Sequence, residues 1–308
     1  MKGSIRSKLI MSLITLVAMV AVLLAGTAHQ TYAAATSFSA VRLDTTPTPE
    51  PANWTIQEGV LYATLPFGSY KLNIYTPDPA PSGNTPIVLF FHGCCNPNTN
   101  RDNALRLGKT PTDPHEYLFR SLMNNGYRVA TLDFPSEYPV VDEHGAEAGK
   151  AAVRFFRANA ATYHIDPTRI IAWGSSGGGY PVTIMGTADA SAGLDIGQNL
   201  NYSSRVEAVV DWYGDPSNFS YVTSDDAPFL IQQGQKDSGF LKADSQDLYN
   251  ALVAANVYAQ LQWVANAGHK FAPAPAGSTT NPTYEGIAQT AVTFLNDKVK
   301  NNPNPLPQ

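Results

Sequence analysis

A serine flanked by glycines follows a short apolar run in the middle of the chain. Residues 174–178 read GSSGG, directly after the run RIIAW of residues 169–173. A strand that turns sharply into a helix strains its central residue, and small neighbours avoid clashes across that turn. The spacing G-x-S-x-G is typical of such a turn and puts Ser176 at its centre. It predicts that Ser176 is an exposed nucleophile; an ordinary Gly/Ser turn is the alternative. Ser175 fits less well, because Trp173 would take the first glycine position.

A nucleophilic serine needs a base that takes its proton, and histidine is the usual one. His269 is the single histidine after Ser176 in the sequence. His115, His144 and His164 precede Ser176 and fall on expected loops or helix ends, where we predict surface histidines. The sequence therefore predicts His269 as the base.

The base in turn needs a carboxylate that orients it. Asp237 follows the apolar run 227–234 and precedes His269 by 32 residues. Gly234 permits a turn that leaves Asp237 at the end of that run. We predict Asp237 as the orienting acid, with Asp211 or Asp226 as alternatives.

The negative charge of a tetrahedral intermediate needs backbone N–H donors. The residue after the nucleophile, Gly177, is expected to supply one donor. The loop after the apolar run 86–93 is expected to supply the other, through Gly93 and Cys94. His92, at the end of the same run, is predicted to support this loop and not to act as a base.

Apolar runs and helical periodicity alternate along the chain, and this indicates a mostly parallel sheet with helices on both faces. The predicted strands are residues 59–65, 69–77, 86–93, 127–135, 169–174, 206–214, 227–234 and 259–264. The predicted helices are residues 115–125, 146–164, 178–186 and 245–257, and a last helix that starts at Asn281 and Pro282. In such sheets ligands bind beyond the carboxyl ends of the strands, where the residues named above are expected to lie.

The two ends of the chain differ in composition from the rest. Residues 1–35 combine a basic start, an apolar stretch and an A-x-A segment, which predicts a cleaved secretory signal peptide, with a membrane anchor as the alternative. Residues 36–58 read as a Thr- and Pro-rich linker, residues 59–300 as the folded domain, and residues 301–308 as a disordered tail. The protein is therefore expected to be secreted, with no stable membrane insertion after the signal is removed.

Charge and cysteine content exclude several classes of protein. The net charge of the chain is −5, and removing the three basic residues of the signal segment makes the remainder more acidic. An acidic chain without a basic patch argues against a nucleic-acid partner. The two cysteines, Cys94 and Cys95, are adjacent and cannot link distant segments, although they could form a strained vicinal disulfide.

Taken together, these motifs resemble those of a known superfamily. The stretches that carry the resemblance are VLFFHGCC, YHIDPTRIIAWGSSGGG, VVDWYGD, LIQQGQKD and GHKF. The chain resembles secreted α/β-hydrolases, near the carboxylesterases and the feruloyl- and acetyl-esterase-like groups, over roughly residues 59–298. The resemblance implies an α/β-hydrolase fold with a central sheet of about eight strands. It departs from the common HGGG pattern, because Cys94 and Cys95 replace two glycines.

The expected activity is hydrolysis of carboxylic esters through a Ser-His-Asp triad and an acyl-enzyme, with no cofactor and no metal. A small-molecule or polysaccharide-borne ester is the expected substrate. A serine peptidase on the same fold and a non-catalytic binding protein are the alternatives. Four aromatic residues near the predicted strand ends are candidates to line a substrate pocket: Tyr180, Trp212, Tyr213 and Phe240.

Overall fold

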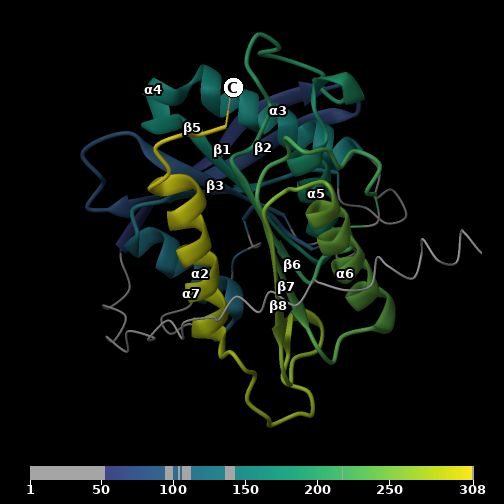
Figure 1. The fold of residues 1–308 in the computed structure, drawn as a ribbon. Coiled ribbons are helices and arrows are strands. Elements are labelled where there is room, and N and C mark those ends of the chain that lie inside the picture. Colours follow the sequence, from purple (N-terminus) through teal and green to yellow (C-terminus); the bar gives the residue numbers. More distant parts are fainter. Residues whose placement is uncertain are drawn as a thin grey trace, which may run out of the picture. The chain divides into compact units, whose positions relative to one another are not determined.

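An eight-stranded sheet forms the centre of the protein (Figure 1). The structure is a computed structural model that describes residues 53–93, 100–102, 105, 112–135, 143–216 and 218–306. These residues lie in one compact unit of the chain, Thr48–Gln308. The strands are β1 (Asn53–Leu65), β2 (Gly68–Asp78), β3 (Thr85–Phe91), β4 (Arg128–Leu132), β5 (Ile165–Ser175), β6 (Ala208–Trp212), β7 (Phe229–Gly234) and β8 (Ala259–Val264).

The order of the strands brings the ends of distant segments together. Across the sheet the order is β1-β2-β4-β3-β5-β6-β7-β8. β2 runs antiparallel to both of its neighbours, and the strands from β4 to β8 pair in parallel. In register, Ser175 lies opposite Trp212, and Gly234 lies opposite Val264. The carboxyl ends of β5, β6, β7 and β8 therefore meet at one edge of the sheet.

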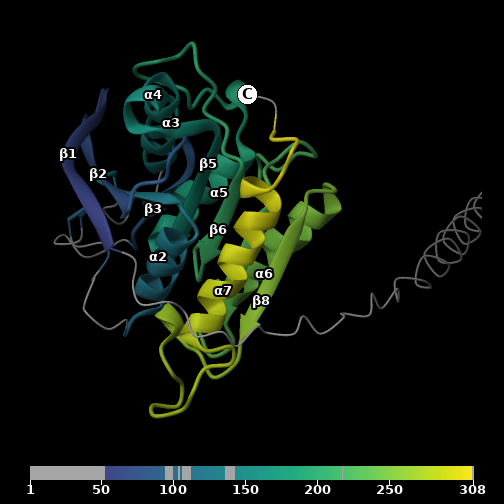
Figure 2. The same cartoon turned by 90° about the vertical axis from the view of Figure 1, so that its left-hand side faces the viewer.

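Helices cover both faces of the sheet, and each face has its own apolar core. The helices are α2 (Pro114–Asn124), α3 (His144–Ala158), α4 (Ala160–Tyr163), α5 (Gly179–Thr187), α6 (Gly239–Ala254) and α7 (Tyr284–Leu295), followed by the π-helical turn η4 (Asn296–Lys300). Figures 1 and 2 show α2 and α7 together on one face and α3, α5 and α6 on the other. Along β3, Ile87, Leu89 and Phe91 join the core under α3, α5 and α6, and Val88 and Phe90 join the core under α2 and α7. This two-sided burial explains why the strand is apolar throughout.

Three helices have limits that differ clearly from the predicted ones. α6 begins at Gly239, six residues before the predicted start at residue 245. The predicted helix 146–164 is divided at Asn159, whose side-chain amide donates to the carbonyl oxygen of Phe155 at 2.8 Å. Asparagine side chains compete in this way with the helical hydrogen bonds of the backbone. The last helix is capped by Thr283, which accepts from the N–H of Gly286 at 3.3 Å, and not by Asn281. Asn281 is instead held in a backbone bridge with Ala265.

The N-terminal strand is longer than predicted. β1 begins at Asn53, within the segment 36–58 that was predicted as a linker. Residues 53–59 are mostly exposed, and the alternation of Trp54 and Ile56 with polar residues extends over only five residues. They are held by backbone pairing with β2, with Thr55 opposite Thr76. The ring of Trp54 also packs edge-on against Phe119 of α2, with 5.0 Å between the ring centroids. The prediction missed this part of the strand because the alternating pattern is short and the contact with α2 is distant in sequence.

The C-terminal segment is docked as far as Leu306, which corrects the prediction of a disordered tail at residues 301–308. The N–H of Leu306 donates to a carboxylate oxygen of Glu207 at 2.9 Å. The side chain of Leu306 packs against the core under α3, α5 and α6. The guanidinium of Arg169 also donates to the carbonyl oxygen of Asn302 at 3.3 Å. These partners lie more than 90 residues away in sequence, so local composition gave no sign of them.

Candidate active site

The turn after β5 holds Ser176 in a left-handed backbone conformation, with φ 53°. Ser176 is half-buried and begins the 3-10 turn η1 (Ser176–Gly178), which leads into α5. A methyl group added at Gly174 would lie 2.2 Å from the carbonyl oxygen of Gly178. One added at Gly178 would lie 2.1 Å from the last carbonyl oxygen of β3. Neither position has room for a side chain, so both residues must be glycine. Gly177 follows Ser176 in η1, where N–H groups have no partner within the helix.

Ser176, His269 and Asp237 form a continuous hydrogen-bonded chain. The Ser176 Oγ lies 2.9 Å from Nε2 of His269, and Nδ1 of His269 lies 2.9 Å from Oδ2 of Asp237. A carboxylate can only accept, so Nδ1 carries the proton and Nε2 is free to accept the serine proton. The side chain of Asp237 is 3% exposed and that of His269 is 34% exposed. The chain thus leads from a buried acid to an accessible hydroxyl.

The carboxylate of Asp237 is stabilised by three donors. Burial raises its pKa, but hydrogen bonds from His269, from the backbone N–H of Ser238 and from the amide of Gln233 outweigh burial and lower it. The Ser238 and Gln233 bonds are 2.7 Å and 2.9 Å long. Gln233 is in turn held by the hydroxyl of Ser245 at 3.3 Å. Sequence reasoning missed Gln233, although two neighbouring glutamines at the end of an apolar strand were a usable signal.

Backbone contacts fix the loops that carry Asp237 and His269. The N–H of Lys236 donates to the carbonyl oxygen of Ala267 at 2.8 Å. A methyl group added at Gly234 would lie 2.5 Å from that oxygen, so Gly234 is needed for space and not, as predicted, for its turn conformation. Lys270 and Phe271, next to His269, have φ values of 60° and 55°. Left-handed conformations cost about 1–3 kcal/mol each at such residues, and they cluster at functional sites.

The end of β3 lies against Ser176. A methyl group added at Gly93 would lie 3.2 Å from Cβ of Ser176. His92 is 3% exposed, its Nδ1 lies 2.9 Å from the carbonyl oxygen of Gly93, and its ring packs on Phe134. Burial lowers the pKa of His92, so the ring is neutral and Nδ1 donates to that carbonyl. Cys94, the other predicted oxyanion residue, lies outside the described residues, as does its neighbour.

The four aromatic residues predicted to line a substrate pocket separate into two groups. Trp212 is fully buried and its indole N–H donates to Gln232, and Tyr213 is 1% exposed. The structure corrects the prediction for these two, because neither side chain can reach a substrate. Tyr180 is half-buried against the core under α5. Phe240 is 61% exposed in the first turn of α6, three residues after Asp237.

The two alternative acids lie apart from His269. Asp226 accepts the backbone N–H of Thr223 at 2.9 Å. Asp211 is fully buried against Gly179 and Gly214, and neither of its carboxyl oxygens makes a hydrogen bond of ordinary geometry within the described part of the chain. Burial raises the pKa of Asp211 to about 7, against the opposing effect of the Gly214 N–H. Asp211 is therefore a buried acid without a base.

The Asp211 carboxyl is expected to destabilise the protein as the pH rises from about 4 to about 7. Over this window the folded state keeps a proton that the unfolded chain has lost, so folding becomes less favourable with rising pH. A shift of about three pKa units corresponds to about 4 kcal/mol. Asp211→Asn removes this titration, so its free energy of unfolding should rise relative to wild type across the window.

Urea unfolding of wild type and Asp211→Asn over this pH range measures the effect. Asp247→Asn, at an exposed position on α6, controls for the loss of one negative charge. A difference between Asp211→Asn and wild type that stays constant with pH would contradict the expectation.

The other histidines are placed differently from one another. His164 is exposed, as predicted, and His144 lies at the surface with 45% of its side chain exposed and its ring stacked on Phe67. His115 was predicted at the surface, but its side chain is only 15% exposed. It lies under the site, with hydrogen bonds to Asp113 and Tyr213. Its burial comes from α2 packing against the sheet, which the local sequence does not show.

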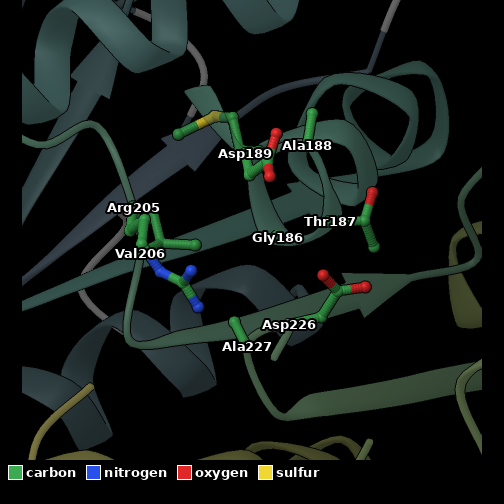
Figure 3. Close-up of a pocket in the computed structure, with 9 residues that line it drawn as sticks. Gly186, Thr187, Ala188, Asp189, Arg205, Val206, Asp226 and Ala227 are labelled. Carbon is green, nitrogen blue, oxygen red and sulfur yellow. The ribbon is translucent and has the colours of Figure 1, made fainter. Parts of the chain in front are cut away.

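Two hollows lie outside the hydrogen-bonded chain. The one in Figure 3 is lined by residues at the far end of α5 from Ser176 and has a volume of about 10 Å³, room for about one water molecule. The other hollow is open and has a volume of about 380 Å³. Most of its lining comes from the segment after His269, between residues 273 and 285. Its lining residues are Tyr117, Pro273, Ser278, Thr279, Thr280, Thr283, Tyr284 and Glu285.

In the described part of the chain, no group of three or more His, Cys, Asp or Glu side chains could hold a metal ion. No helix in the same part of the chain is long and apolar enough to cross a membrane.

Two family models match the chain. The model BD-FAE matches residues 72–220, and the model of the dienelactone hydrolase family matches residues 197–297. Together the matches extend from β2 to just beyond α7, and they overlap at residues 197–220, which include β6. No curated protein matches the chain.

Solved structures share the fold. A truncated carbohydrate esterase from gut microbiota is 21% identical with a TM-score of 0.61, over 82% of this chain and 98% of that one. The Thermogutta terrifontis esterase Est2 with bound butyrate is 19% identical with a TM-score of 0.58, over 81% and 94% of the two chains. The same esterase phosphorylated by paraoxon is 20% identical with a TM-score of 0.58, over 83% and 97%. The chain has the α/β-hydrolase fold, and the proteins of known structure that share this fold with it include carboxylic ester hydrolases.

Proposed function

We propose that the protein is a serine-dependent hydrolase of carboxylic esters, with Ser176, His269 and Asp237 as its catalytic triad. One observation carries the proposal: the unbroken chain of two 2.9 Å hydrogen bonds that links the three side chains. The strained, accessible position of Ser176 on the turn after β5 supports it. Family models and similar structures support ester hydrolysis as the general activity.

The geometry suits a two-step acyl transfer. The Ser176 oxygen attacks the ester carbonyl carbon while its proton passes to Nε2 of His269. The tetrahedral intermediate collapses, the C–O bond to the alcohol breaks, and the alcohol leaves with the proton from Nε2. Water then attacks the acyl-enzyme with His269 as base, which releases the acid and restores the serine hydroxyl. Asp237 keeps the imidazole in the required tautomer and stabilises its charged form.

Backbone N–H groups beside Ser176 are the proposed oxyanion hole. The N–H of Gly177 stands at the start of a helical segment, where it has no intrahelical partner and where developing negative charge is stabilised. The second donor is assigned to the loop after β3, at Gly93 and Cys94. The close approach of Gly93 to Ser176 supports this assignment.

The proposed substrate is a small or polysaccharide-borne ester. Support comes from a carbohydrate esterase among the similar structures and from the exposed Phe240, which could contact an acyl or aromatic group near the triad. We also propose that the protein is exported, on the basis of the basic and apolar character of residues 1–35. No cofactor enters the proposed mechanism.

Ester hydrolysis and covalent labelling test the proposal together. The purified protein should hydrolyse p-nitrophenyl acetate, and paraoxon should stop the reaction by placing one diethylphosphoryl group on Ser176. Mass spectrometry of the peptide that contains Ser176 locates the group. If acetyl, butyryl and feruloyl esters all react at the rate of buffer and no label appears, the proposal is wrong. Labelling with cleavage of peptides but not of esters would instead favour a serine peptidase.

A further inference from the structure

A second hydrogen-bonded chain, with the same order of chemical groups as the triad, lies beneath it and leads from the partly exposed Asp113 to the buried Tyr213. We infer that Asp113, His115 and Tyr213 form a positioning chain that holds the ring of Tyr213 against the imidazole of His269. The inference rests on the proposed function, because the group that it positions is the proposed base. It extends that function to residues that make no contact with substrate.

The chain begins at the N-terminus of α2. Asp113 is the N-cap of the helix and Pro114 is its first residue. One carboxylate oxygen of Asp113 accepts both the backbone N–H of His115 at 2.8 Å and its Nδ1 at 2.6 Å. The cap thus fixes the start of the helix and the orientation of the His115 ring at once. With Nδ1 donating to a carboxylate, Nε2 of His115 can accept.

Tyr213 completes the chain. Its hydroxyl lies 2.9 Å from Nε2 of His115. Burial raises the pKa of Tyr213 far above its usual value, so the phenol keeps the proton that it donates; the Ser175 hydroxyl has an opposing effect. The His115 ring is itself enclosed by aromatic rings of the sheet, namely Phe90, Trp173 and Trp212. Every group of the chain therefore has a fixed partner.

The backbone of Tyr213 shows that its position is imposed by these contacts. Tyr213 has φ 40°, a strained value for a bulky residue, directly after β6. Its N–H donates to the carbonyl oxygen of Gln232 at 2.9 Å. The hydrogen bond from the Tyr213 hydroxyl to His115 helps to offset this backbone strain. Without that bond, the Tyr213 ring would be freer to move.

The Tyr213 ring is in direct contact with the proposed base. Its centroid lies 5.0 Å from that of His269 at an interplanar angle of 68°, and 4.8 Å from that of Phe271 at 83°. Asp237 fixes one nitrogen of the imidazole, and the tyrosine edge limits rotation and tilt of the ring. Proton transfer from Ser176 requires this alignment, because hydrogen bonds weaken steeply away from linear geometry.

Tyr213→Phe tests the inference, since it removes the hydroxyl and keeps the ring. We expect kcat to fall about 5- to 20-fold with KM unchanged within about twofold, because Tyr213 is buried and does not contact substrate. The rate constant of phosphorylation by paraoxon should fall in step with kcat, because both reactions need His269 to take the serine proton. Normalising kcat to the number of paraoxon-labelled sites removes any contribution from misfolded protein.

Two further variants separate positioning from stability. Tyr127→Phe deletes a similar 2.9 Å bond, from a buried tyrosine to Asn296, and should lower stability without changing kcat or KM. His115→Gln keeps a polar atom near the position of Nε2 and should retain more activity than His115→Leu. In the double variant Tyr213→Phe/His115→Leu, the losses should not add, because both act through one chain.

The outcomes distinguish this inference from the proposed function. If wild type hydrolyses esters but Tyr213→Phe has wild-type kcat per labelled site, the positioning chain is wrong and the triad stands. The positioning chain is also wrong, and the triad again stands, if Tyr127→Phe lowers kcat as much as Tyr213→Phe does. A loss of stability would then explain the lower kcat of both variants. If wild type neither hydrolyses esters nor takes up paraoxon, the proposed function itself fails.

Discussion

Ser176→Ala is expected to lower kcat for p-nitrophenyl acetate by about 10⁴-fold or more, to near the rate in buffer. The variant removes the atom that forms the acyl-enzyme, and His269 then has no hydroxyl to deprotonate. The small side chain avoids new clashes on the crowded turn, where space beside the flanking glycines is already filled. Steady-state hydrolysis and paraoxon labelling of the same preparation measure the effect, and the label should also disappear.

Ser220→Ala is the matched control for this substitution. Ser220 is exposed, and its hydroxyl donates to Asn218 at 2.7 Å, away from the triad. It should retain wild-type kcat and take up one label. If Ser176→Ala kept more than about a tenth of wild-type kcat, the nucleophile would have to be another residue, and the assignment of the turn would be wrong.

Asp237→Asn is expected to lower kcat by about 10⁴-fold with a much smaller change in KM. The asparagine amide can donate a hydrogen bond to Nδ1 of His269, which places the imidazole proton on Nε2. Nε2 then faces the Ser176 hydroxyl as a donor and cannot take its proton. The N–H of Ser238 can still donate to the remaining carbonyl oxygen, whereas Gln233, which donates to the oxygen that the new amide group replaces, must turn its amide to keep a hydrogen bond.

Asp226→Asn is the control for Asp237→Asn, because Asp226 was an alternative acid in the sequence and lines the small cavity at the other end of α5 (Figure 3). It should leave kcat within about twofold of wild type. A large loss in Asp226→Asn together with a small loss in Asp237→Asn would reverse the assignment. Comparable losses in both would indicate a general effect on folding, which thermal unfolding of each variant would reveal.

Much of the fold was predictable because its elements are encoded locally. Strands β3, β4, β6 and β7 and the second half of β5 are buried on both faces, so they appear as mainly apolar runs. β8 is mostly half-buried, and its limits also match the predicted ones. Boundaries failed where an apolar side chain packs against a distant element, as Trp54 does against Phe119, or where one polar side chain divides a helix, as at Asn159. The apolar pattern around Trp54 is too short to show the first effect, and the second leaves the apolar pattern unchanged.

The sequence by itself also determined which residues could form the site. Ser176 was marked by its glycines, and His269 was the single histidine downstream. Asp237 followed a strand end in the required chain order. These signals are local or depend on the order of the residues along the chain. The three residues come together because a parallel sheet brings the carboxyl ends of its strands to one edge. The requirement for Gly174 and Gly178 is equally local, although its cause, contact with neighbouring backbone, appears only in the structure.

Only the tertiary structure decided what surrounds the three residues. Trp212 and Tyr213 looked like pocket residues and His115 like a surface residue, yet all three belong to the packed interior beneath the site. Gln233 gained its role from the position of Asp237 after folding. The physical reason is that periodicity encodes which face of an element is buried. A buried polar group often pairs with a residue that is distant in sequence. Trp212 and Gln232 are 20 residues apart, and Tyr213 and His115 are 98 residues apart. No local sequence pattern records such a contact.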